Sequence, residues 1–156
     1  MNIHRTFRRT LILVLAVIVP LHAQAQTASD SHIRNVALRV LELDVRRQLP
    51  SAAPATIDSL LALYTDSVVY EHPSVGAVVR GKAALRAGML KYLGSVRVAQ
   101  IETPRLVIGP GVVVVEATAR PDPRDPSRVI PPSRRAVRVL EFDARGLVRR
   151  ILDYPW

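Results

Sequence analysis

The chain has 156 residues, the usual length of one domain, and its 49% hydrophobic and 22% charged residues are typical of a folded globular chain. It contains no cysteine, which excludes disulfides, cysteine-ligated metal sites and cysteine nucleophiles. Lys and Arg number 22 against 13 Asp and Glu, but the basic residues are spread along the chain and are not interleaved with aromatic residues. We therefore expect no nucleic-acid partner.

Residues 1–25 have the pattern of a secretory signal peptide. Three arginines precede an apolar run over 11–19, and Ala23-Gln24-Ala25 has the form of a cleavage site. An uncleaved anchor is the alternative, although the run is shorter than the roughly 20 apolar residues of a spanning helix. Cleavage removes three of the 22 basic residues and leaves 19 against 13. We expect an exported protein, periplasmic or secreted, with no stable membrane insertion after cleavage.

Two helices are predicted at the start of the mature chain. Apolar residues recur every three or four positions over 30–48 and again over 56–64, which is the period of a helix with one buried face. A short breaker at 51–54 separates them. We assign 26–55 to an N-terminal helix and its breaker, and 56–156 to the core of the domain.

The period then changes to that of a strand. Residues 67–72 are rich in β-branched and aromatic side chains, and Pro73 holds the residue before it in an extended conformation. A short extended piece ends at Val79. Helical spacing returns over 81–93, which predicts a third helix that ends at Gly94.

Everything beyond Gly94 has the pattern of strands. Glycine-containing turns are predicted at 109–111 and 143–146, and five prolines mark 121–132 as a loop. The predicted strands are 96–108, 112–120, 134–142 and 147–154. This order predicts an α+β domain in which three N-terminal helices cover one face of a cone-shaped, curved antiparallel sheet that encloses a cavity.

Three segments resemble the nuclear transport factor 2-like superfamily, and more narrowly its SnoaL-like members. They are residues 63–73, 80–86 and 141–154, and the resemblance extends over 57–156. It implies the cystatin-like α+β barrel of that superfamily. Isomerases, cyclases, hydrolases, dehydratases and many non-catalytic proteins share this fold, so the resemblance does not identify a reaction.

The resemblance directs attention to His72 and Arg138. In the ketosteroid isomerases of this superfamily, a proton-transferring Asp stands directly before a Pro at the end of the first strand, and His72 matches that position. A histidine can also move protons near neutral pH. The second acid of the isomerase pocket falls at about Arg138, which could stabilise an oxyanion or hold a carboxylate. The helix-one Tyr of those enzymes has no counterpart over 30–48, so we do not expect steroid isomerisation.

Alternate residues of a strand point to the same face of the sheet, and this alternation is compatible with a site that contains both His72 and Arg138. His72 shares a strand face with Val68 and Tyr70, and Arg138 shares one with Leu140. In the functional interpretation, His72 and Arg138 are catalytic and meet inside the cone. The residues expected to bind the ligand around them are Tyr64, Tyr70, Tyr92, Phe142 and Trp156.

The structural interpretation stays open beside it. There, His72 is a hydrogen-bonded residue at a strand end, and Arg138 pairs with Glu116 or Glu71 across the sheet. No metal and no cofactor are expected, because His32 and His72 lack the spacing that places two ligands on one helix face. A serine hydrolase is not predicted either, because the Gly-x-Ser-x-Gly motif is absent.

Three functions remain under consideration. The first is an exported protein that binds a small, partly apolar molecule, neutral or anionic, in the cone, with no assigned reaction. The second is an isomerase, hydratase or lyase that uses His72 as general acid-base, and the third is a non-catalytic dimerising module. Sheet-to-sheet dimers are frequent in the resembled superfamily, and aromatic residues at the chain end suit such a contact, so we expect a homodimer.

Overall fold

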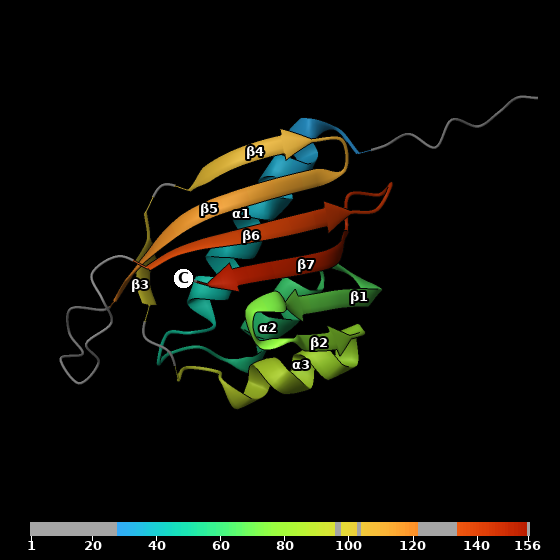
Figure 1. The fold of residues 1–156 in the computed structure, drawn as a ribbon. Coiled ribbons are helices and arrows are strands. Elements are labelled where there is room, and N and C mark those ends of the chain that lie inside the picture. Colours follow the sequence, from blue (N-terminus) through green and yellow to red (C-terminus); the bar gives the residue numbers. More distant parts are fainter. Residues whose placement is uncertain (1–27, 96–97, 103, 122–133, 156) are drawn as a thin grey trace, which may run out of the picture.

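The computed structural model describes residues 28–95, 98–102, 104–121 and 134–155 (Figure 1). The predicted signal peptide 1–25 and Trp156 lie outside these residues, as does nearly all of the proline-rich loop. No helix within the described ranges has the length and apolar character needed to cross a bilayer.

Three α-helices precede most of the sheet, as predicted. They are α1 (Asp30–Arg46), α2 (Pro54–Leu61) and α3 (Lys82–Lys91). The side chain of Ser29 caps α1 by accepting a hydrogen bond from a backbone N–H in the first turn, and α2 begins with a proline, whose missing N–H costs nothing there. A single 3₁₀ turn, η1 (Pro73–Val75), follows the first strand.

The second helix begins two residues before the predicted start, at Pro54 inside the predicted breaker, and it ends three residues before the predicted end. It ends at Leu61, and Tyr64 is the first residue of the following strand. The early end of the helix has a physical reason. The Leu63 carbonyl accepts a hydrogen bond of 2.9 Å from the backbone N–H of Val148 instead of one from a further turn of the helix. That bond joins the chain to the last strand of the sheet, so the apolar period at Tyr64 belongs to a strand.

One curved sheet contains every described strand. Its order is β2-β1-β7-β6-β5-β3, and β4 also pairs with β5. Figure 1 shows α1 behind β4, β5 and β6, with α2 and α3 next to β1 and β2. The strands are β1 (Tyr64–His72), β2 (Ala77–Arg80), β3 (Val98–Ile101), β4 (Arg105–Gly109), β5 (Val112–Pro121), β6 (Arg134–Phe142) and β7 (Val148–Pro155).

The sheet differs from the prediction in three respects. It is mixed rather than purely antiparallel, because β1 and β7 run parallel. It is curved but does not close into a barrel. The strand predicted over 96–108 is two strands, β3 and β4, and Pro104 lies between them without the N–H that a ladder needs.

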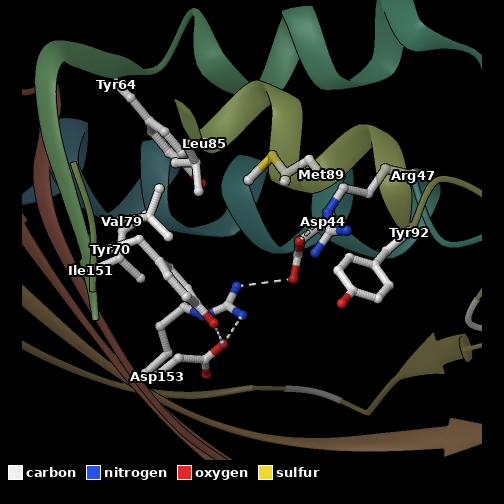
Figure 2. A pocket seen from close by; sticks show the side chains of 12 residues that line it. Asp44, Arg47, Tyr64, Tyr70, Val79, Leu85, Met89, Tyr92, Ile151 and Asp153 are labelled. Atoms are coloured by element: carbon white, nitrogen blue, oxygen red, sulfur yellow. Dashed lines mark hydrogen bonds and ion pairs between the residues drawn. The ribbon is translucent and has the colours of Figure 1, made fainter. Parts of the chain in front are cut away.

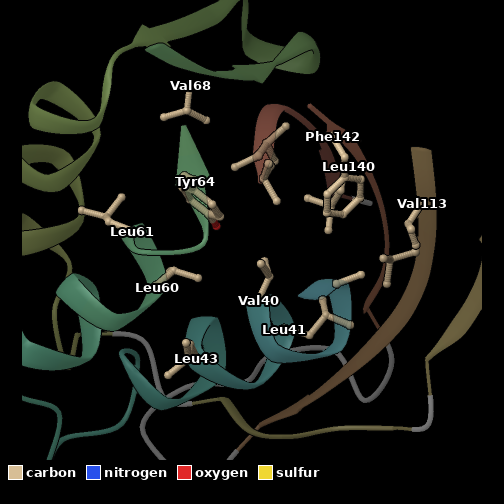
Figure 3. Close-up of a cluster of buried hydrophobic side chains, with 14 of the residues drawn as sticks. Val40, Leu41, Leu43, Leu60, Leu61, Tyr64, Val68, Val113, Leu140 and Phe142 are labelled. Atoms are coloured by element: carbon tan, nitrogen blue, oxygen red, sulfur yellow. The ribbon is translucent and has the colours of Figure 1, made fainter. Parts of the chain in front are cut away.

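The hydrophobic core lies between α1 and the inner face of the sheet. Figure 3 shows Val40 and Leu41 pointing from α1 toward Leu140 and Phe142 of β6. All four side chains are buried, and each contributes roughly 1.5–3 kcal/mol by leaving water. The core anchors α1 on the sheet and so fixes the position of the last turn of this helix, where the polar residues of the site begin.

Candidate functional site

A cavity of about 230 Å³ lies between the end of α1, α3 and the inner face of the sheet (Figure 2). Both α1 and α3 contribute residues to it, as do strands β1, β2, β6 and β7. Part of its wall is apolar and consists of Val79, Leu85, Gly88, Met89 and Ile151. The remaining wall carries three tyrosines and four charged side chains, so one molecule would meet both kinds of surface.

Arg138 is the centre of the charged part. Cross-strand pairing places it opposite Asp153 of β7, and its Nη2 donates to Asp153 Oδ2 at 2.7 Å. Its Nη1 donates to Asp44 Oδ2 of α1 at 3.0 Å. Arg138 therefore joins two carboxylates that come from opposite sides of the cavity (Figure 2).

Asp44 lies in the last part of α1, on the face that also carries the buried residues Ala37 and Val40. Both of its carboxylate oxygens are occupied, because Oδ1 accepts from Arg47 Nε at 2.6 Å and Oδ2 accepts from Arg138. Burial by itself would raise the pKa of Asp44, but the two guanidinium groups outweigh burial and hold this pKa below its ordinary value. Asp44 is therefore a fixed, fully paired anion.

Asp153 is paired differently. Its Oδ2 accepts hydrogen bonds from Arg138 and, at 3.2 Å, from the hydroxyl of Tyr70. Its Oδ1 has no hydrogen-bond partner among the residues that the structure describes. Burial, together with the nearby Asp153 carboxylate, raises the pKa of Tyr70 to about 12, so this phenol stays protonated and donates to Asp153 over the whole neutral range.

Tyr64 adds a second phenol to the cavity wall. Tyr64 is 2% exposed, and within the described ranges its hydroxyl forms no hydrogen bond. Burial raises the pKa of Tyr64 well above its ordinary value, and Asp44 raises it further. Tyr64 is therefore a neutral hydroxyl group that can donate to a bound molecule.

The charges of the site cancel. Two carboxylates, Asp44 and Asp153, face two guanidinium groups, Arg47 and Arg138. Burial would lower the pKa of Arg138, but Asp44 and Asp153 raise it well above its ordinary value. Its buried Nε has no partner in the described part of the chain. Removing one member of such a buried cluster would leave the charge of its partner uncompensated, which is costly.

The structure brings together four of the residues selected from the sequence. Tyr64, Tyr70, Tyr92 and Arg138 all line the cavity. Tyr92 is 62% exposed and belongs to the open side. Phe142 packs in the hydrophobic core instead of lining the cavity, and Trp156 lies outside the described residues.

His72 is not brought to Arg138. It is the last residue of β1, it does not line the cavity, and its Nδ1 shares a hydrogen bond of 3.0 Å with the Ser74 hydroxyl. His72 pairs with Ala77 of β2, whereas Glu71 is the last residue of β1 that pairs with β7. The expected approach of His72 to Arg138 therefore has no counterpart in the geometry.

Arg138 forms ion pairs, as the structural interpretation expects, but with other partners than those expected. Arg138 pairs with Asp44 and Asp153, and neither of the two glutamates expected from the sequence contacts it. Glu71 instead binds Arg150 at 2.9 and 3.2 Å. On the other face of the sheet, Glu116 Oε1 lies 3.7 Å from Arg135 Nη1.

Sequence reasoning missed Asp44, Arg47 and Asp153. A signal was present for two of them. Asp44 follows Ala37 and Val40 at helical spacing, so it is a carboxylate on an apolar helix face. Asp153 has the strand parity of buried Ile151. A buried carboxylate requires a partner, and Arg138 is a basic residue on the neighbouring strand that pairs with Asp153 across the sheet.

Comparison with known proteins agrees with this fold. The model of the SnoaL-like domain family matches residues 45–151, and both aspartates of the site lie just outside that segment. No curated protein matches the chain. Among solved structures, a candidate isomerase from Bacillus subtilis has a TM-score of 0.64 at 15% identity, covering 81% of this chain and 87% of its own.

Two further structures are similar to the same extent. An NTF2-like protein of unknown function from Cytophaga hutchinsonii has a TM-score of 0.62 at 15% identity, with 83% of this chain and 100% of that chain covered. A SnoaL-like protein of unknown function from Burkholderia thailandensis has a TM-score of 0.61 at 14% identity, with 82% and 97% covered. At these identities the likeness concerns the fold and not the chemistry.

Proposed function

The chain belongs to the SnoaL-like domain family, and from this premise we propose that it binds a small, partly apolar molecule in the cavity beside Arg138. The single observation that carries the proposal is the cavity itself. It has an aliphatic wall formed by Val79, Leu85, Met89 and Ile151, and it has polar groups at fixed positions on the opposite wall. This combination is typical of sites that bind small molecules.

The volume limits the size of the ligand. The cavity of about 230 Å³ is larger than the ~150 Å³ apolar cavity that accommodates benzene, and smaller than the ~300 Å³ at which sites for drug-sized ligands begin. A molecule of one or two rings is therefore the appropriate class.

Export belongs to the same proposal. The basic start, the apolar run and the Ala-Gln-Ala triplet within residues 1–25 support cleavage after Ala25 and a periplasmic or secreted protein. N-terminal sequencing of the protein from its own host would then begin at Gln26. A chain that retains residues 1–25 would contradict this part of the proposal.

The outer face of the sheet supports a homodimer. Val107, Val114, Val139 and Leu152 are cross-strand neighbours on β4, β5, β6 and β7, and their parity places them opposite the buried face. Val107 is 60% exposed. An apolar row across four strands suits a second copy of the same sheet.

The enzymatic alternative has no comparable observation in its favour. An isomerase-, hydratase- or lyase-type mechanism based on His72 requires this imidazole to reach a bound molecule, and His72 does not line the cavity. A purely dimerising module would not need the cavity. Binding is therefore the function that the geometry supports best.

Gly88 provides the test. It lines the cavity, and a Cβ built there has no atom within 4 Å, so a larger side chain enters open space. Native mass spectrometry of the protein from its exported fraction, compared with the denatured mass, should show a small non-covalent adduct. The adduct should be absent from Gly88→Leu and present in Gly88→Ala. An adduct that Gly88→Leu retains would place the ligand elsewhere.

A further inference from the structure

The polar side chains of the cavity differ in how many of their hydrogen-bonding atoms are already used. Both oxygens of Asp44 accept bonds from arginines. Asp153 uses Oδ2 twice and leaves Oδ1 without a partner among the described residues. A carboxylate oxygen only accepts, so the unfilled position at Asp153 calls for a donor from the bound molecule.

We infer that the cavity selects uncharged molecules that carry a hydroxyl group, and that Asp153 binds this hydroxyl through its second carboxylate oxygen. The inference deepens the proposed binding function and rests on it. It assigns a ligand chemistry to the site, namely a neutral one- or two-ring alcohol or phenol. The aliphatic wall around Leu85, Met89 and Ile151 accommodates the rings.

The charge balance argues against an anionic ligand. Arg138 already faces two carboxylates, and Arg47 faces one of them, Asp44. An entering anion would compete with Asp44 or Asp153 for a guanidinium and leave a buried carboxylate without its cation, which is costly. The Nε of Arg47 already donates to Asp44 Oδ1 at 2.6 Å.

Tyr64 and Tyr70 play different parts. The Tyr70 hydroxyl donates to Asp153 Oδ2 and so fixes the carboxylate, with Oδ1 left over for the ligand. The Tyr64 hydroxyl lines the cavity with no hydrogen bond to a described residue. It supplies a second polar contact for an oxygen of the ligand.

Three probes of one shape separate the possibilities. 2-Naphthol is neutral at pH 7 and has a hydroxyl donor, 2-methoxynaphthalene is neutral without a donor, and 2-naphthoate is an anion. Isothermal titration of the wild-type protein should give the tightest binding for 2-naphthol. We expect the other two probes to bind about tenfold more weakly. The methoxy probe cannot donate a hydrogen bond to the carboxylate of Asp153, and the anion disturbs the ion pairs of the cavity.

Two aspartate variants test the assignment to Asp153. Asp153→Asn removes one negative charge and the accepting carboxylate, so it should weaken 2-naphthol binding about tenfold and strengthen 2-naphthoate binding. Asp44→Asn changes the charge equally but leaves Asp153 in place, so it should strengthen 2-naphthoate binding and keep the preference for 2-naphthol over the methoxy probe. Asp66→Asn is the surface control, because Asp66 is 98% exposed.

The outcomes separate this inference from the function on which it rests. If the wild-type protein binds none of the three probes, the binding proposal fails and the inference falls with it. If the probes bind but 2-naphthoate or 2-methoxynaphthalene equals 2-naphthol, binding stands and the hydroxyl selectivity is wrong. The wild-type comparison needs no variant, so a misfolded variant cannot obscure this result.

Discussion

Arg138 on β6 and Asp44 on α1 lie 94 positions apart in the chain and are joined by a hydrogen bond of 3.0 Å across one end of the cavity. The same guanidinium holds Asp153 on β7 at 2.7 Å. One cation therefore ties the end of the first helix to the last two strands. It keeps the cavity polar on that side, whereas side chains of α3 and β7 keep it apolar elsewhere.

Replacing Arg138 with Met should destabilise the fold. The substitution leaves Asp44 and Asp153 buried without their shared cation, and losing one member of a buried ion pair costs about 3–5 kcal/mol. Urea denaturation measures the change. The matched control is Arg145→Met, because the Arg145 side chain is 73% exposed and should lose less than about 1 kcal/mol. Equal losses in the two variants would mean that the buried cluster does not stabilise the fold.

Acid should weaken the protein partly through Asp44. Its pKa lies below the ordinary value of 3.8, so the native state binds this proton less readily than the unfolded state. The stabilisation by Asp44 is therefore fully present above about pH 4 and is lost as the pH falls through the native pKa. The free energy of unfolding, measured from pH 7 down to about pH 3, should fall less in Asp44→Asn than in the wild-type protein. Parallel curves would exclude Asp44 as a source of the acid sensitivity.

Two glycines of one segment should respond in opposite directions to alanine. Gly88 lies inside α3, and a methyl group at this position would meet no atom within 4 Å, so Gly88→Ala should stabilise by about 0.5–1 kcal/mol. Gly81 precedes the helix with φ of +83°, which favours glycine, so Gly81→Ala should destabilise by about 1–3 kcal/mol. Thermal unfolding of both variants measures the difference. A stabilised Gly81→Ala variant would contradict the backbone argument.

His72→Ala should leave ligand binding unchanged. His72 contacts Ser74 and does not line the cavity, so its removal affects only the end of β1. Titration with 2-naphthol should give the wild-type affinity within about twofold, which is near 0.4 kcal/mol. A tenfold loss in a folded His72→Ala variant would return His72 to the site.

The apolar row on the outer face predicts the assembly state. Val139 lies in the middle of this row, between Val114 and Leu152, and Val139→Lys places a charge there. Size-exclusion chromatography with light scattering should give a dimer for the wild-type protein and a monomer for the variant. A wild-type monomer at tens of micromolar would contradict the proposed dimer.

The features that were predicted well from the sequence are those set by neighbouring residues. Three helices, the turn that ends at Gly111 and the turn over 143–146 all lie where apolar period and glycine placed them. Partners far apart in the chain leave no such pattern. The parallel pairing of β1 with β7, which shortens α2 and places Tyr64 in the sheet, joins residues more than 80 positions apart and could not be inferred from spacing.

The site also combines residues that local pattern could identify with contacts between residues far apart in the chain. Tyr64, Tyr70 and Arg138 were selected from the sequence, and the structure places all three in the wall of the cavity. His72 was also selected by resemblance and parity, but the β1–β7 register shifts between Tyr64 and Val69, and His72 lies beyond Glu71, the last residue of β1 that pairs with β7. Asp44 was missed because a search for apolar periodicity passes over a carboxylate on the apolar face.

The most direct test of the binding function is a ligand-observed NMR screen of neutral one- and two-ring compounds against three proteins: wild type, Gly88→Ala and Gly88→Leu. The cavity account predicts compounds that bind the wild-type protein and Gly88→Ala but not Gly88→Leu, because only the larger side chain fills the space beside Met89. Compounds that bind all three proteins equally, or a screen in which none binds the wild-type protein, would contradict it.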